Sequence, residues 1–127
     1  MTGGEFAVLV AAGGIGAALR FLVDRAATGP NGASAFPLGI LIGNGVGSFV
    51  LGGLVAVGDA IAPAWLAILG IGLVGGFTTF STMAVDTVRL ARAGRRDWAW
   101  LNLVGSFVAC VAAAGVGGML GGLVPLG

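Results

Sequence analysis

Four long uncharged stretches divide the chain, and they limit its fold more than any other feature. The six basic and five acidic residues leave uncharged segments at 6–19, 26–58, 60–85 and 98–127. An α-helix needs about 20 apolar residues to cross the roughly 30 Å hydrocarbon core of a bilayer. Charged residues make up only 9% of the 127 positions, which is too few to cover the surface of a soluble domain. The sequence therefore predicts an integral membrane protein.

Turn signals between and within these stretches predict an all-α protein with four transmembrane helices. A Gly-, Pro- and Asn-containing segment at 28–34 interrupts the second stretch, Asp59 and Pro63 mark another turn, and the charged segment 92–97 marks the last. The expectation is a single membrane domain over 1–127 with helices near 5–25, 36–57, 63–91 and 98–122. The opening residues carry an acid rather than the basic charge of a secretory signal, so the first helix is expected to be a true span.

The basic residues lie on only one side of this predicted arrangement. All six are arginines that lie within or beside the loops 26–35 and 92–97: Arg20, Arg25, Arg89, Arg92, Arg95 and Arg96. Because basic loops stay in the cytoplasm, both termini are expected outside and the chain in one fixed orientation. The predicted location is the cell membrane, as a multi-pass protein.

The residues that are absent exclude several functions. The chain has no His, and Cys110 is its only cysteine. It therefore lacks an imidazole general base and the ligands of a zinc or iron–sulfur site. The net charge of +1 gives no reason to expect a nucleic acid partner. We expect a protein that is not an enzyme.

A polar motif occurs twice. Asn44-Gly-Val-Gly-Ser48-Phe is repeated as Asn102-Leu-Val-Gly-Ser106-Phe, with five of six residues identical. In each copy the Asn and the Ser are four residues apart, so they share one face of a helix. Such a face either forms hydrogen bonds to a neighbouring helix or lines a polar pathway.

Small residues form a stripe on the second predicted helix. Gly39, Gly43 and Gly47 are spaced four apart, which allows another helix to approach closely. The stripe predicts a tight contact, either within the chain or with a second subunit.

The third predicted helix carries a weak point at residues 75–83. Paired glycines followed by threonines and a serine have low helix propensity. Non-helical backbone at membrane depth exposes carbonyls that bind cations, and free N–H groups and hydroxyls that bind anions. The sequence predicts a break in mid-membrane; the alternative is a kinked, continuous helix whose hydroxyls bond back to the preceding turn.

Three motifs together resemble the Fluc/CrcB family of fluoride channels over essentially the whole chain. They are Gly-Ala-x-x-Arg ending at Arg20, Gly-Asn-x-x-Gly-Ser-Phe around Asn44, and Gly-Gly-x-Thr-Thr-Phe-Ser-Thr at 75–82. The resemblance implies an antiparallel dimer of four-helix subunits with two pores, each lined by both subunits. It also implies passive, selective export of fluoride that is trapped in the cytoplasm.

The resemblance further implies roles for individual residues. Asn44 would line the pore with its amide, and Phe80 would be the first of two rings that flank the ion. Carbonyls of Gly75 and Thr78 would hold a structural Na⁺ at the dimer centre. The remaining residues expected along the pore or its vestibule are Ser48, Ser81, Thr82, Met83, Asn102, Ser106 and Arg20.

Two departures from the family pattern leave alternatives open. Met83 stands where relatives usually have a second Phe, and Asn102 where they often have Tyr. The one-sided arginines are a further departure, because an antiparallel homodimer needs half of its chains inserted each way; they favour a heterodimer with a paralogue of inverted charge over a homodimer. The chain would then be a channel subunit or a non-conducting accessory subunit. A small multidrug-type exporter is a weaker alternative, since it needs a carboxylate within the membrane.

Overall fold

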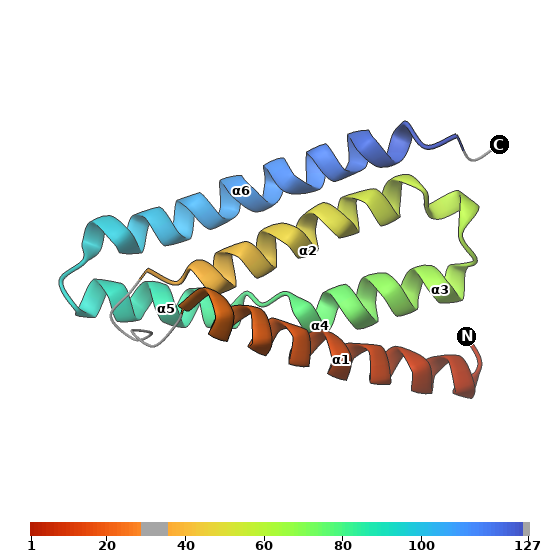
Figure 1. Cartoon of the computed structure of the whole chain (residues 1–127), viewed down its shortest axis with the longest axis horizontal. Coiled ribbons are helices and arrows are strands. Elements are labelled where there is room, and N and C mark those ends of the chain that lie inside the picture. The colour runs from red at the N-terminus through yellow and green to blue at the C-terminus, as the bar shows by residue number, and fades with distance from the viewer. Residues whose placement is uncertain (29–35, 126–127) are drawn as a thin grey trace.

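Four helices of membrane-spanning length form an antiparallel up-and-down bundle in the computed structural model, which describes residues 1–28 and 36–125. They are α1 (Gly3–Thr28), α2 (Leu38–Ala56), a composite third span over Pro63–Arg92, and α6 (Arg96–Gly122) (Figure 1). The four predicted spans are confirmed, and their ends differ from the expected ones by at most three residues. Most of the predicted loop at 28–34 lies outside the described residues.

The third span consists of several short segments. It contains α3 (Pro63–Ala67), the π-helical segment η3 (Ile68–Val74), α4 (Gly75–Phe77) and α5 (Ser81–Arg92). Between α4 and α5 the chain leaves the helix, and Thr78 is extended, with φ −91° and ψ 156°. The predicted break is therefore present. It lies just after the paired glycines, which themselves remain helical.

Two tight turns connect the spans. The short 3₁₀ segment η2 (Gly58–Ala60) leads into α3, whose first residue is Pro63, a favoured position because proline has no N–H to lose there. Gly94 connects α5 to α6 with a φ of +82°, which a glycine adopts without the steric cost of a side chain. The N-terminus and the last turn of α6 lie at the same end of the bundle as η2 (Figure 1).

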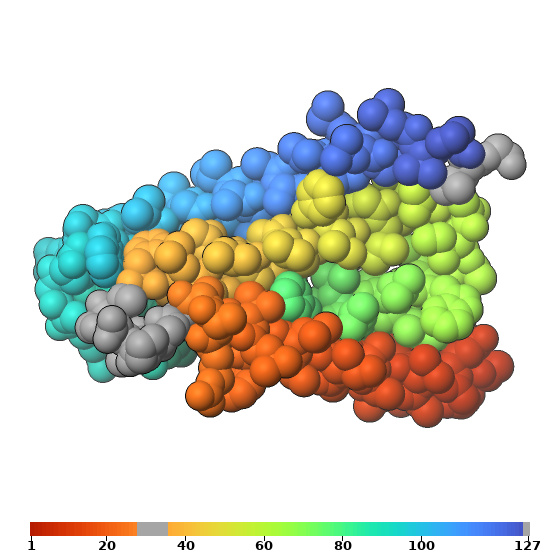
Figure 2. Space-filling view, viewed as in Figure 1, coloured from red at the N-terminus to blue at the C-terminus, as the bar shows by residue number. Residues whose placement is uncertain are grey.

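Glycines bring the helices into close contact. A Cβ at Gly76 of α4 would overlap the carbonyl oxygen of Gly13 in α1. A Cβ at Gly117 of α6 would likewise overlap the carbonyl oxygen of Phe49 in α2. Figure 2 shows α1 and α6 on opposite sides of the bundle, with α2 between them. The small residues thus fix both outer helices against the centre.

The predicted glycine stripe of α2 makes its contacts within the chain. A Cβ at Gly39 would lie 2.5 Å from the Asp24 carboxylate, and Gly43 lies against the ring of Phe77. A Cβ at Gly47 would overlap the side chain of Thr78. The stripe therefore seats α2 against α1 and the interrupted span.

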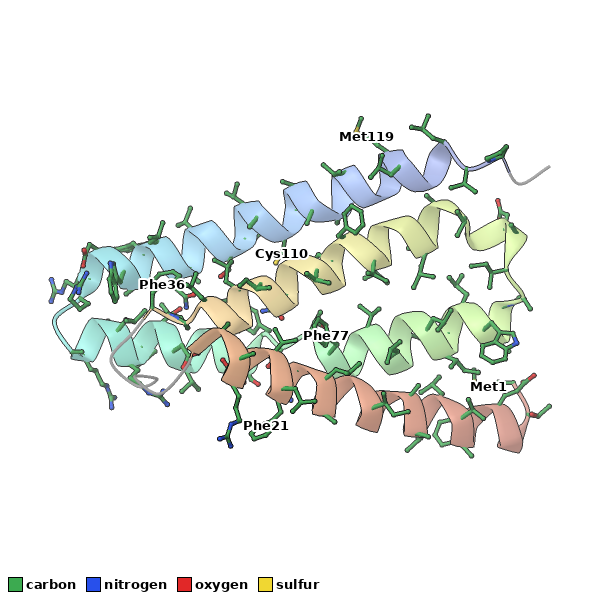
Figure 3. All side chains as sticks on the ribbon, viewed as in Figure 1. Met1, Phe21, Phe36, Phe77, Cys110 and Met119 are labelled. Carbon is green, nitrogen blue, oxygen red and sulfur yellow. The ribbon has the colours of Figure 1, made fainter. Side chains whose placement is uncertain are left out.

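The interior is small and partly polar. The buried hydrophobic residues of the described chain are Ile40, Ile68, Val74, Met83, Leu90 and Ala99. Asn44, Asn102 and Ser106 are buried with them. Most large apolar side chains point outward instead (Figure 3). That surface is suited to lipid or to a partner subunit rather than to water.

Candidate functional site

A groove of about 410 Å³ lies between α2, the interrupted third span and α6. Six of the predicted site residues line it: Asn44, Ser48, Thr78, Phe80, Met83 and Ser106. Thr79, Phe107 and Cys110 also line it, and Figure 3 shows Cys110 between α6 and α2. The lining is apolar except for amide, hydroxyl, thiol and main-chain groups. No acidic residue occurs among the described residues of this lining.

Asn44 holds the break in the third span. Its Nδ2 donates to the carbonyl oxygen of Thr79 at 2.8 Å, and the N–H of Thr79 donates to its Oδ1 at 2.8 Å. One side chain thus satisfies both main-chain groups of a residue that the helix leaves unpaired, as buried main-chain groups require. The same pair fixes the orientation of the amide, because exchanging its oxygen and nitrogen would break both bonds. Asn44 also lines the groove, and its Nδ2 carries a second N–H beside the one that bonds Thr79.

The hydroxyl of Thr79 organises the start of α5. Its Oγ1 accepts a hydrogen bond from the N–H of Thr82 at 3.2 Å and lies 3.2 Å from Ser81 Oγ. It also donates to Thr82 Oγ1 at 3.3 Å. Thr79 precedes the N-cap residue Phe80, which makes no side-chain cap bond, and it satisfies one of the first N–H groups of α5, which have no partner within the helix. The predicted polar residues Ser81 and Thr82 are therefore gathered around Thr79.

The break also changes the pairing of the Gly75 carbonyl. In a continuous helix this oxygen would accept the N–H of Thr79, four residues later, but that N–H donates to Asn44. Within the described residues, no main-chain N–H donates to the Gly75 carbonyl. Thr78 instead bonds back to the preceding turn, its Oγ1 donating to the Val74 carbonyl at 3.0 Å. Gly75 is exposed and does not line the groove.

A second polar cluster joins α5 to α6 behind the groove. Asn102 is only 1% exposed, and its Nδ2 donates to Thr87 Oγ1 at 2.9 Å and to the Met83 carbonyl at 3.3 Å. Thr87 Oγ1 donates to the same carbonyl at 2.8 Å. Asn102 Oδ1 and Ser106 Oγ are buried and have no partner in the described part of the chain. Ser106 lines the groove, but its hydroxyl oxygen is itself buried there.

Phe80 and Met83 occupy different environments. Phe80 is 75% exposed on the open side of the groove, whereas Met83 is 7% exposed. The sulfur of Met83 lies 3.7 Å from Thr87 Oγ1. The ring is thus free to meet a second molecule, while the thioether belongs to the interior.

Arg20 lies outside the groove lining but close to the break. α1 runs parallel to the third span, and a Cβ at Gly16 would contact the Phe77 N–H. Arg20 is one turn further along α1, so it lies level with the break. Its Nε is buried and has no hydrogen-bond partner among the described residues.

The comparisons with known proteins agree with this architecture. The family model of CrcB-like proteins, described as camphor resistance (CrcB), matches residues 7–121. The chain belongs to the CrcB family. The resemblance that was drawn from the three motifs is thereby confirmed.

Relatives within the CrcB family match over most of their length. A protein of Leifsonia xyli subsp. xyli, named fluoride-specific ion channel FluC 1, is 45% identical over 88% of this chain and 82% of its own. A protein of the same name from Rubrobacter xylanophilus is 40% identical over 95% of this chain and 96% of its own length. Fluoride-specific ion channel FluC of Shewanella amazonensis is 37% identical over 88% of this chain and 91% of its own length.

Sequence reasoning gave no role to Thr79 and Thr87, two residues whose hydrogen bonds hold the site together. Thr79 is part of the quoted Thr-Thr motif, but its main-chain bonds to Asn44 do not depend on residue type, and its hydroxyl bonds to Ser81 and Thr82 depend on where the helix breaks. Thr87 lies four residues after Met83, and that spacing was the available signal for its bond back to the Met83 carbonyl.

Proposed function

We propose that this chain forms a passive, selective channel through which fluoride leaves the cytoplasm. The observation that carries the proposal is the Asn44–Thr79 pair, with two hydrogen bonds of 2.8 Å. Fluoride is small and strongly hydrated, so a pore must replace its water with hydrogen-bond donors. The names of the relatives support the same substrate.

The locked amide favours an anion over a cation. With Oδ1 engaged by the Thr79 N–H, Asn44 offers the groove an N–H donor and cannot turn its oxygen there. A freely rotating amide would present either group. Preorganised donors of this kind need no rearrangement when the ion arrives. Ser106 lines the same groove, and its buried hydroxyl, which has no partner in the described chain, would extend the donor path where the pore reaches it.

Phe80 is the side chain suited to contact the ion from the open side of the groove. The edge of an aromatic ring carries partial positive charge, and the ring is largely exposed. Met83 is a flexible thioether without such an edge, so the second ring of the family pattern has no equivalent at this position.

A second subunit completes the site in this proposal. One wall of the groove is open and Phe80 is uncovered, so an antiparallel dimer would close the pore. The unpaired Gly75 carbonyl fits a structural Na⁺ at the dimer centre, together with the Thr78 carbonyl, because carbonyl oxygens suit alkali cations. Bound there, the ion would hold the two interrupted spans together. The partner is a second copy or an inverted paralogue.

Met83 favours one alternative function, that of an accessory subunit whose pore depends on the partner subunit.

Efflux of fluoride from liposomes that contain this chain alone tests the proposal, with efflux of chloride measured for comparison. We expect fluoride-selective efflux, lost in Asn44→Asp because an oxygen replaces the donor. If a folded sample conducts nothing, alone or with an inverted paralogue, the channel proposal is wrong. Efflux only with the paralogue, unaffected by Asn44→Asp, establishes the accessory role.

A further inference from the structure

A second groove, of about 360 Å³, lies between the start of α2 and the start of α6. Its lining is apolar: Phe36, Leu38, Leu41, Trp98, Leu101 and Gly105. Leu101 and Gly105 are four residues apart and share one stripe of α6. Because Gly105 has no side chain, the stripe is hollow at that point. None of its lining residues belongs to the first groove.

The charged end of this groove is built around Trp98. The guanidinium carbon of Arg95 lies 3.6 Å from the centroid of the Trp98 ring. Phe36 meets the same ring edge-on, with centroids 5.8 Å apart. The Arg95 Nε and Nη2 also donate to the two carboxylate oxygens of Asp97, at 3.3 and 3.4 Å, in an exposed ion pair. These contacts hold one cation beside an apolar surface, and a tryptophan there is typical of the membrane–water interface.

The surroundings of the groove are basic. Residues 92–97 carry three arginines and one aspartate, a net charge of +2. Arg92, Arg95 and Arg96 are all exposed. An apolar slot that ends in exposed arginines is complementary to a molecule with an apolar tail and an anionic head.

We propose that this groove binds one anionic phospholipid. Its acyl chain lies along α6 from Trp98 to Gly105, a distance of about 10 Å at 1.5 Å per residue. Its phosphate meets Arg95, and the exposed Arg92 and Arg96 lie within three residues of Arg95 in the chain. The bilayer supplies this ligand wherever the chain resides, and the site does not depend on which ion the first groove conducts.

The fluorescence of Trp98 tests the proposal through lipids that quench it. Trp65 and Trp100, which are exposed, are first replaced by Phe in the full chain. Vesicles then contain phosphatidylglycerol or phosphatidylcholine, brominated near the headgroup end of the acyl chains. We expect a relative affinity about fivefold higher for phosphatidylglycerol, the ratio expected when one arginine attracts an anionic headgroup.

Two variants and a matched control separate the parts of the site. Arg95→Gln should bring the two lipids to equal quenching. Gly105→Leu should do the same with every charge retained, since its added side chain fills the groove. Arg25→Gln removes the same charge from another exposed arginine that is stacked on a ring, with its guanidinium carbon 5.7 Å from the centroid of Phe21. It should leave the preference unchanged.

Three results would overturn the proposal. Equal quenching by both lipids in the parent chain means that there is no headgroup selection. An equal loss in Arg25→Gln and Arg95→Gln means that general surface charge, not the groove, attracts the lipid. No quenching by either lipid means that another protein surface, such as a second copy, covers Trp98.

Discussion

Replacing Asn44 with alanine should release the non-helical segment of the third span. The substitution removes the two hydrogen bonds of 2.8 Å to Thr79. A main-chain group left unpaired in an apolar environment costs about 1–3 kcal/mol. Two such groups give about 2–6 kcal/mol, and the half-buried position of Thr79 favours the lower end.

Hydrogen–deuterium exchange of the Thr79 amide measures this effect directly. A loss of about 2 kcal/mol in the free energy of opening corresponds to roughly thirtyfold faster exchange. The assay is mass spectrometry of peptides that cover residues 77–85 in the purified, detergent-solubilised chain. Fluoride efflux should fall in the same variant.

Asn102→Ala is the matched control, because it removes the equivalent residue of the repeated motif. Asn102 bonds to Thr87 and the Met83 carbonyl and has no bond to Thr79. It should weaken the contact between α5 and α6 without faster exchange at Thr79. Unchanged exchange in Asn44→Ala, or equal exchange in both variants, would refute the assignment of Asn44 as the residue that holds the break.

Three further predictions test the packing, the pore and the orientation. Gly117→Ala should lower the free energy of unfolding by about 1–3 kcal/mol, because the added methyl group overpacks α6 against α2. Gly115→Ala, whose added Cβ meets nothing within 4 Å, should raise the free energy of unfolding by about 0.5–1 kcal/mol. Thermal unfolding in detergent compares the two variants, and equal effects would contradict the close contact at Gly117. Phe80→Ala should reduce fluoride efflux by about tenfold while the unfolding temperature stays the same. The stability should not change because the ring is exposed, and surface substitutions alter the free energy of unfolding by no more than about 0.5 kcal/mol. Undiminished efflux would argue against a role for the ring in the pore. Ala93→Cys in a Cys110→Ala background should be labelled by a membrane-impermeant reagent only from the cytoplasmic side, and labelling from both sides would disprove a fixed orientation.

The number of helices and the family could be predicted from the sequence because both depend on patterns along the chain. Apolar length and turn residues were sufficient for the four spans. The exact position of the break in the third span was harder to predict. Gly75 and Gly76 have the lowest helix propensity of the segment, yet they stay helical, since the close approach of Gly13 to Gly76 depends on helical packing there.

The detailed site could be predicted only in part. Asn44 was expected to act through its amide on an ion, but its bonds to Thr79 are tertiary contacts across 35 residues. No spacing rule reports such a contact, because it depends on how α2 is placed against the third span. The burial of Met83 beside Thr87 is likewise a consequence of packing between α5 and α6.

The exchange of partners at Thr79 also makes the interruption of the third span depend on another helix. Without Asn44 of α2, the Thr79 N–H would have no partner across the bundle, and an unpaired N–H in hydrocarbon is costly. The nearest alternative acceptor is the Gly75 carbonyl, four residues earlier, and that bond would close the gap in the helix. The most apolar 18-residue window of Pro63–Arg92 has a mean hydropathy of 1.7, which suits a continuous span equally well. The opening in the backbone is therefore a property of the packed bundle rather than of the third span alone.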